Sequence, residues 1–187
     1  PLGPLKLTGI MAPPTDAGFP PAYECHREPE APMPDFSVVE TSETPYLFVA
    51  GTCSMAPGDI SEAMGAAFHE VLGAMQSNGI APAGPALSVY HDYDPQVMRF
   101  RAGFVVARDA LDHAGGGVEG DMLPAGRALH FVHVGPYATL RDDYEKMMDH
   151  LTHQGLTLGA PSWELYLDDP ETVPEAKLRT AVYCALA

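Results

Sequence analysis

An internal repeat constrains the fold of this chain more than any other feature. A shift of 76 residues places Gly79 on Gly155, Pro85 on Pro161, Tyr90 on Tyr166 and Asp92 on Asp168. After a slip of two residues, the segment 99–106 falls on 177–184. Repeats of this kind are single supersecondary units that bury their apolar faces against one another. A chain of 187 residues therefore predicts two copies of one unit rather than two unrelated domains.

The same elements are expected in both copies. Apolar residues recur at helical intervals from Asp59 to Asn78 and from Thr139 to Gly155, which predicts two helices. Short runs rich in Val, Phe, Tyr and Leu predict strands at 45–52, 86–91, 97–107, 128–135, 163–167 and 177–186. The order β-α-β-β occurs twice. We therefore expect an α+β fold with pseudo-twofold symmetry, in which both helices cover one face of an antiparallel sheet and a ligand groove lies on the other.

A proline-rich segment and a glycine-rich segment mark the boundaries of the two repeats. Residues 1–35 hold nine of the nineteen prolines and predict an extended arm, with a vector-derived leader over residues 1–10. The first repeat is expected at 36–110 and the second at 128–187. Residues 111–127, which contain three consecutive glycines, are expected to form a connector.

Charge narrows the choice of partners. Ten Lys and Arg against 25 Asp and Glu give a net charge of −15, which repels phosphate backbones and attracts cations. Nucleic acid is therefore not expected as a partner. No apolar run approaches the ~18 residues of a membrane span, and no signal peptide is evident. The three cysteines form no C-x-x-C pair, so we expect a cytoplasmic protein without disulfides.

Alternation along the strands assigns side chains to the two faces of the sheet. One parity is apolar in both repeats, and we expect it to pack under the helices: Leu87, Val89, Trp163 and Leu165. The other parity is expected on the open face, away from the helices: Ser88, Tyr90, Glu164 and Tyr166, joined by Arg179 and Tyr183 of the last strand. The ligand groove is expected on this open face.

Glu164 is the central candidate for function, because an ionised carboxylate inside an apolar strand loses solvation unless it is paired. One interpretation is a solvated residue, or one that is paired with Arg179. The other is a cleft carboxylate that orients a cation or moves a proton. The tyrosines expected around it are Tyr90, Tyr137, Tyr166 and Tyr183. Aromatic faces stabilise cations, although ordinary sheet packing would also explain these residues.

No cofactor or metal site is expected. His130 and His133 lie three residues apart in a strand, so they point to opposite faces and cannot share a metal. His150 and His153 could face together on a helix, but no third ligand completes a site. Glycine-rich phosphate loops and nucleophile elbows do not occur in the sequence.

Short motifs follow one another in the second half of the chain: His133-Val-Gly-Pro-Tyr137, then Trp163-Glu-Leu-Tyr166, Asp169-Pro170 and Leu178-Arg-Thr180. In this order they resemble the GyrI-like small-molecule-binding family, which also occurs as the effector-binding domain of AraC-type and multidrug-sensing regulators. The resemblance covers residues 36–187. It implies two β-α-β-β halves and a groove between them for lipophilic, often cationic drugs, with Glu164 as the carboxylate in that groove.

The resemblance leaves three functions open. The arm has no room for a helix-turn-helix, so we expect a stand-alone protein that binds lipophilic aromatic or cationic molecules, as in drug or toxin sequestration and antibiotic resistance, through Glu164 and the four tyrosines. One alternative is a metal-independent hydrolase of cyclopropane-bearing DNA-alkylating natural products. Glu164 would then be the general base, and Tyr137 or Tyr183 would donate a proton. The other alternative is an acidic inhibitor that binds DNA gyrase through Asp142, Asp143 and neighbouring acids.

Overall fold

A computed structural model describes residues 34–113 and 115–187 of the chain. The leader and nearly all of the arm expected from the sequence lie outside the described residues. The described strands are β1 (Ser37–Thr41), β2 (Thr44–Ser54), β3 (Ala86–Tyr90), β4 (Val97–Val105), β5 (Glu119–Leu123), β6 (Gly126–Val134), β7 (Leu158–Tyr166) and β8 (Arg179–Leu186). The helices are α1 (Pro57–Ser77) and α2 (Leu140–Gln154), with short 3₁₀ turns η1 (Arg108–His113), η2 (Tyr137–Thr139) and η3 (Glu175–Lys177).

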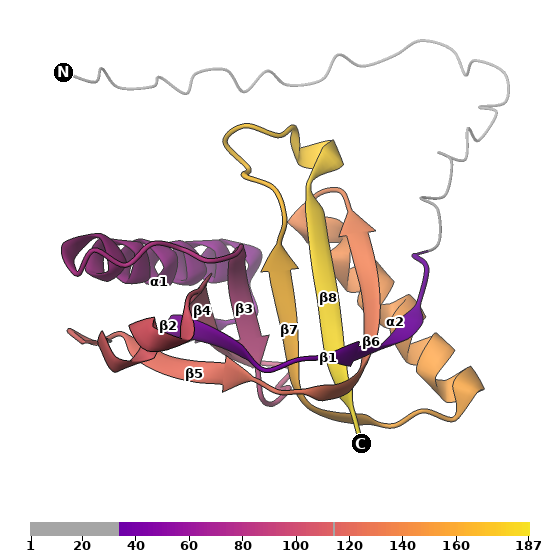
Figure 1. The fold of residues 1–187 in the computed structure, drawn as a ribbon. Helices are drawn as coiled ribbons and strands as arrows, with labels where there is room; N and C mark the ends of the chain where they lie inside the picture. Colours follow the sequence, from indigo (N-terminus) through magenta and orange to yellow (C-terminus); the bar gives the residue numbers. More distant parts are fainter. Residues whose placement is uncertain (1–33, 114) are drawn as a thin grey trace, which may run out of the picture. The chain divides into compact units, whose positions relative to one another are not determined.

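The strands form one antiparallel sheet in the order β1-β6-β8-β7-β3-β4-β2-β5 (Figure 1). The predicted α+β fold is confirmed, and every strand and helix expected from the sequence is present in the expected order. β1 and β5 were not expected. β1 pairs with β6 of the second half, and β5, which forms within the expected connector, pairs with β2 of the first half. β1 of the first half therefore forms the edge of the second half, and β5 of the connector forms the edge of the first.

A proline marks the start of α1 and a glycine marks the end of α2. α1 begins at Pro57, two residues before the expected Asp59, because proline suits the first turn of a helix. The Ser54 hydroxyl accepts the backbone N–H of Ala56 at 3.1 Å and donates to Asp59 at 2.6 Å. The helix α2 ends at Gly155, as the sequence predicted. The φ of Gly155 is +64°, in the left-handed region.

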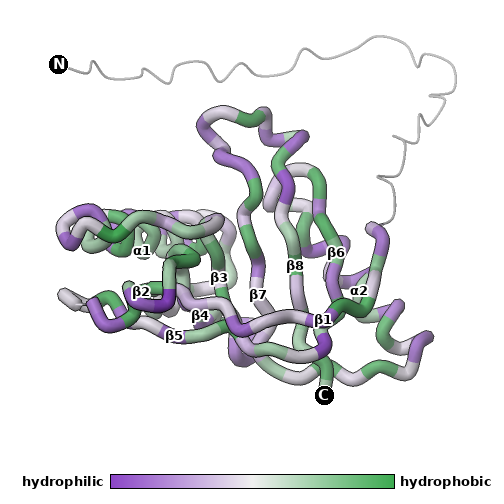
Figure 2. Tube along the Cα trace, viewed as in Figure 1, coloured by the Kyte–Doolittle hydropathy of each residue, from purple (hydrophilic) through white to green (hydrophobic). Residues whose placement is uncertain are grey.

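Both helices lie on the same face of the sheet. Val71 and Met75 of α1 pack with Leu47 of β2, and Met147 and Leu151 of α2 pack with Phe131 of β6. The helix-free face is also buried, because the sheet curls into a half-barrel. Residues from both ends of the sheet meet there in one core: Tyr46, Phe48, Leu87, Val89, Leu123, Ala128 and Trp163. Figure 2 shows apolar residues along the helices and along the central strands alike.

The expected assignment of strand faces is wrong for the central strands. Leu87, Val89 and Trp163 belong to the core on the helix-free face, so the opposite parity of β3 and β7 faces the helices. The curled sheet buries both of its faces. Apolar residues at alternate positions of a strand therefore could not show which face of the sheet the helices cover. Among the described helices, none is both long enough and apolar enough to cross a membrane.

Candidate functional site

The pseudo-twofold axis of the fold passes between β3 and β7, which lie side by side at the centre of the sheet. Ser88 pairs directly with Glu164, and these two residues are equivalent under the 76-residue repeat. Two further equivalent pairs surround them on the helix face: Tyr90 with Tyr166, and Phe68 of α1 with Tyr144 of α2. We call these residues the axial cluster: Phe68, Ser88, Tyr90, Tyr144, Glu164 and Tyr166.

Glu164 is the buried carboxylate at the centre of this cluster, and its side chain is held by tyrosine hydroxyls. Tyr144 donates to Oε1 at 2.9 Å, and Tyr166 donates to Oε2 at 3.0 Å. Tyr90 makes a longer hydrogen bond of 3.4 Å to Oε2. Glu164 is only 6% exposed. It forms no ion pair with any residue in the described part of the chain.

Burial and hydrogen bonding act in opposite directions on this carboxylate. Burial raises the pKa of Glu164, whereas the tyrosine donors and the nearby His133 lower it, and burial has the larger effect. Burial together with the charge of Glu164 holds the pKa values of Tyr90, Tyr144 and Tyr166 well above their usual range. The tyrosines therefore remain neutral donors, and Glu164 is the one member of the cluster that can supply a negative charge.

The sequence correctly placed Tyr90 and Tyr166 beside Glu164. Tyr137 lies at the solvent side of the same cluster: it is 42% exposed, and its ring meets that of Tyr166 edge to face at 5.6 Å. The predicted position of Tyr183 is wrong. Val182 pairs with Glu164 and shares its face, so alternation along β8 places Tyr183 on the opposite face.

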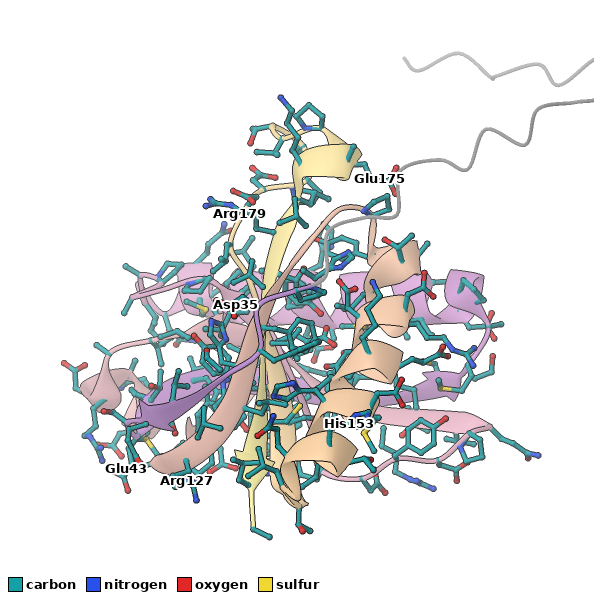
Figure 3. All side chains as sticks on the ribbon, turned by 90° about the vertical axis from the view of Figure 1, so that its right-hand side faces the viewer. Asp35, Glu43, Arg127, His153, Glu175 and Arg179 are labelled. Carbon is teal, nitrogen blue, oxygen red and sulfur yellow. The ribbon has the colours of Figure 1, made fainter. Side chains whose placement is uncertain are left out.

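Tyr183 belongs to an aromatic stack on the helix-free face. Its ring lies 5.4 Å from that of Trp163 and 4.3 Å from that of His130. It therefore cannot donate a proton beside Glu164. The expected alternative partner of Glu164, Arg179, is also elsewhere, because its guanidinium is bonded to Asp168 at 2.8 and 2.9 Å. Figure 3 shows Arg179 and Glu175 at the protruding end of the β7–β8 connection.

Sequence reasoning missed two members of the cluster. Phe68 and Tyr144 were assigned only to the apolar sides of their helices, whereas Ser88 was expected on the same face of the sheet as Glu164. The repeat contains the signal that identifies them, because a shift of 76 residues links Phe68 to Tyr144 and Ser88 to Glu164. Phe68 also contacts the ring of Tyr166 edge to face at 5.9 Å. Two residues that are equivalent under the repeat and also lie opposite each other must be close to the pseudo-twofold axis.

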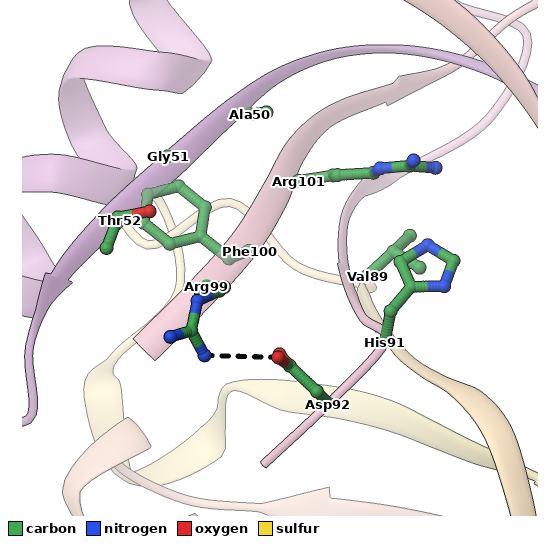
Figure 4. A pocket seen from close by; sticks show the side chains of 9 residues that line it. All are labelled: Ala50, Gly51, Thr52, Val89, His91, Asp92, Arg99, Phe100 and Arg101. Atoms are coloured by element: carbon green, nitrogen blue, oxygen red, sulfur yellow. Dashed lines mark hydrogen bonds and ion pairs between the residues drawn. The ribbon is translucent and has the colours of Figure 1, made fainter. Parts of the chain in front are cut away.

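A hollow of about 420 Å³ lies on the helix-free face, next to the turn between β3 and β4 (Figure 4). Its charged lining is already compensated: Arg99 pairs with Asp92 at 3.1 Å, and Arg101 pairs with Asp121. Glu164 faces the opposite side of the sheet. The hollow is therefore separate from the axial cluster.

The histidines have structural partners. His133 faces α2 and bonds to Asp143, while His130 stacks on Tyr183, so the two point to opposite faces as predicted. Within residues 34–113 and 115–187, no three His, Cys, Asp or Glu side chains converge in a way that could hold a metal ion.

Residues 34–187 match the GyrI-like small molecule binding domain, so the chain belongs to the GyrI-like family. This confirms the resemblance found in the sequence. A sequence comparison with curated proteins gave no match.

Solved structures share the fold at low sequence identity. The C-terminal domain of EcmrR has a TM-score of 0.66 and 19% identity, with 83% of this chain and 98% of that chain covered. SAV2435 bound to tetraphenylphosphonium has a TM-score of 0.58 and 14% identity, with coverage of 82% and 94%. A hydrolase from Listeria innocua has a TM-score of 0.55 and 16% identity, with coverage of 84% and 94%.

Proposed function

We propose that the axial cluster binds a lipophilic organic cation, with Glu164 as its counter-charge. The observation that carries this proposal is a buried carboxylate that has hydrogen-bond donors but no cation among the described residues. A desolvated charge without an ionic partner is costly, and a ligand cation removes that cost. Sequestration of a drug or toxin requires no more than such binding.

Aromatic rings around Glu164 suit the same ligand. Tyr90, Tyr166 and Phe68 surround the carboxylate, and a cation over an aromatic face gains about 0.5–2 kcal/mol per ring. Tyr137 offers a partly exposed ring on the solvent side. The net charge of −15 also raises the concentration of cations near the protein. A structural relative, SAV2435, was solved with the lipophilic cation tetraphenylphosphonium.

The Thr180 hydroxyl adds a polar contact for the ligand. Thr180 lies on β8, on the helix face between Tyr166 of β7 and His133 of β6. Its Oγ1 is buried and has no hydrogen-bond partner among the described residues. Buried hydroxyls without partners are rare in proteins, and a ligand that displaces neighbouring side chains would satisfy this one. We therefore expect the ligand to carry a polar atom in addition to its cationic centre.

Two ligands of the same shape and opposite charge test the proposal. Calorimetric titration with tetraphenylphosphonium should give clear binding, whereas tetraphenylborate should bind far more weakly. Glu164→Gln should weaken tetraphenylphosphonium binding by about 100-fold, because the buried charge pair is lost. The matched control Glu175→Gln alters an exposed carboxylate and should change affinity by less than about fivefold. Equal binding of both ligands, or unchanged affinity in Glu164→Gln, would rule out the cation site.

Hydrolysis is a second candidate, because burial raises the pKa of Glu164 towards the range in which a carboxylate accepts a proton. Glu164 would take a proton from water while the water oxygen bonds to a cyclopropane carbon. The broken C–C bond would leave its electrons on the conjugated oxygen of the ligand, which Tyr137 would protonate, and the proton held by Glu164 would then return to the tyrosinate. Mass spectrometry after incubation with a cyclopropane-bearing alkylator separates the two functions: a water adduct supports hydrolysis, and intact ligand supports sequestration.

An acidic surface that binds gyrase gains no support from the structure. Asp143, one of its expected residues, is buried and bonded to His133 and Lys146. Asp168 is likewise bonded to Arg179. Acids committed to internal ion pairs are poorly placed to bind a basic partner.

A further inference from the structure

The hydroxyl protons of the axial cluster are all used within the cluster. Tyr144 donates to Oε1 of Glu164 at 2.9 Å, while Tyr166 and Tyr90 donate to Oε2 at 3.0 and 3.4 Å. The Tyr166 hydroxyl also lies 3.0 Å from Oγ of Ser88. Tyr166 has one hydroxyl proton, and an ionised carboxylate is a stronger acceptor than a hydroxyl, so Ser88 donates to Tyr166.

The Glu164 carboxylate still has room for one more hydrogen bond. Its two oxygens can together accept about four. Oε2 receives hydrogen bonds from Tyr90 and Tyr166, whereas Oε1 receives one from Tyr144 alone among the described residues. The cluster can therefore offer a ligand an acceptor at Oε1. A ligand with an N–H group can use that acceptor, whereas a quaternary cation, which has no N–H, cannot.

A second acceptor lies beside the cluster, at Thr180 of β8. Thr180 pairs with Tyr166 of β7, and Val182, two residues further along β8, pairs with Glu164. Glu164 and Thr180 are therefore diagonal neighbours on the helix face, with Cα atoms about 7–8 Å apart. The Thr180 side chain is fully buried, and its Oγ1 has no hydrogen-bond partner among the described residues. A donor that reaches this oxygen would satisfy it.

We propose that the axial cluster prefers a protonated primary or secondary amine to a quaternary cation of similar size. One ammonium N–H donates to Oε1 of Glu164, and a second donates to Oγ1 of Thr180. The amine carries an aromatic body, which packs against the rings of Phe68, Tyr90 and Tyr166. This inference rests on the proposed cation site and specifies its ligand class: the polar contact expected at Thr180 is an N–H donor.

Hydration opposes this preference, so the order of affinities is decisive. An ammonium N–H is strongly hydrated in water, and its burial without a partner is unfavourable. Methyl groups in place of N–H groups add apolar area, which favours burial. Attraction to the carboxylate and contact with aromatic faces are available to both kinds of cation. A site without acceptors would therefore bind the quaternary cation more tightly, and hydrogen bonds to the protein reverse that order.

Three cations with the same aromatic body and different numbers of N–H groups test the proposal. Bis(phenylethyl)ammonium has two N–H groups, its N-methyl derivative has one, and its N,N-dimethyl derivative has none. Calorimetric titration of the full chain is carried out at neutral pH, where the amines are protonated. Affinity should fall along this series by about tenfold for each N–H group that is lost. Tetraphenylphosphonium, which also has no N–H group, serves as the reference cation.

Thr180→Val tests the second acceptor, because valine keeps the shape of threonine and lacks its hydroxyl. It should lower the affinity of bis(phenylethyl)ammonium about tenfold. The other cations should change by less than about twofold, because a single N–H donates to the charged carboxylate. The variant should fold, since it removes a buried hydroxyl that has no partner. The matched control Thr52→Val removes an exposed strand hydroxyl beside the separate hollow and should leave every affinity unchanged.

The two proposals fail in different ways. If neither tetraphenylphosphonium nor any member of the series binds, the cation site itself is wrong. If the cations bind but the quaternary member binds as tightly as bis(phenylethyl)ammonium or more tightly, the cation site stands and the preference for N–H donors is overturned. A preference that persists unchanged in Thr180→Val would rule out Thr180 as the second acceptor.

Discussion

At the scale of single residues, the proposed cation site sets the cost of burying Glu164 against a gain in binding. Its carboxylate is removed from water, and phenol hydroxyls replace only part of the lost solvation. An amide in its place would be uncharged and of nearly the same shape. Substitution should therefore improve folding and impair binding, which is the behaviour expected of a residue kept for function.

The pH dependence of stability follows from the raised pKa of Glu164. In the unfolded chain the carboxyl titrates in its ordinary range, so folding favours the neutral acid. That contribution is present below the ordinary pKa and is lost as pH rises through the raised one. Glu164→Gln should therefore match wild type most closely in acid and become increasingly more stable towards neutral pH, by about 1.4 kcal/mol for each unit of pKa shift.

Urea unfolding at a series of pH values measures this difference. Glu175→Gln, which changes an exposed carboxylate, serves as the control and should show no such trend. A stability difference between wild type and Glu164→Gln that is constant across pH would mean that the carboxylate is not desolvated in the folded protein.

At the scale of the elements, two glycines affect the stability of the helices in opposite ways. Gly155 ends α2 with a φ of +64°, a conformation that costs other residues about 1–2 kcal/mol. Gly73 lies inside α1, and an added Cβ there would meet nothing within 4 Å. Gly155→Ala should lower the free energy of unfolding by about that amount, while Gly73→Ala should raise it by about 0.5–1 kcal/mol.

Thermal and urea unfolding of the two variants make a matched pair, since each adds one methyl group to a helix or its end. Stabilisation by Gly155→Ala would show that the left-handed cap is not maintained in solution. Destabilisation by Gly73→Ala would show that the outer side of α1 is covered by something beyond the described residues.

The sequence was informative about elements because their signals are local. The stop at Gly155 and the buried positions of α2 follow from neighbouring residues. β1 and β5 were missed because each is a five-residue edge strand with charged residues, and its pairing depends on the opposite half of the chain. The expected neighbourhood of Tyr183 and Glu164 failed for a related reason. Tyr183 does lie away from the helices, as expected, but Glu164 faces them, because the curl of the whole sheet decides which parity of β3 and β7 meets the helices and no local pattern records it.

At the scale of the whole molecule, the halves are interdependent. β1 pairs with β6, β5 pairs with β2, and β3 pairs with β7 across the axis. A separated half would expose several unpaired strand edges and part of the core on the helix-free face.

Fragments 34–113 and 115–187 should therefore remain unfolded when prepared separately. The intact chain should unfold in a single transition over its described part. Circular dichroism should show native-like signal only when both fragments are mixed. A cooperative transition in either fragment alone would contradict the interdependence of the halves.

Because Ser88 and Glu164 face each other across the pseudo-twofold axis, they determine how many negative charges lie at the centre of the axial cluster. A residue on a twofold axis faces its own counterpart, so identical halves would place either two hydroxyls or two carboxylates opposite each other. Two carboxylates that close could not both ionise, and the shared proton would leave a site tuned by acidity rather than by cation binding. With one serine and one glutamate, only one carboxylate lies at the pseudo-twofold axis. Under the proposed function this single charge matches a monovalent cation, and Ser88→Glu should convert the pair into a proton-sharing dyad.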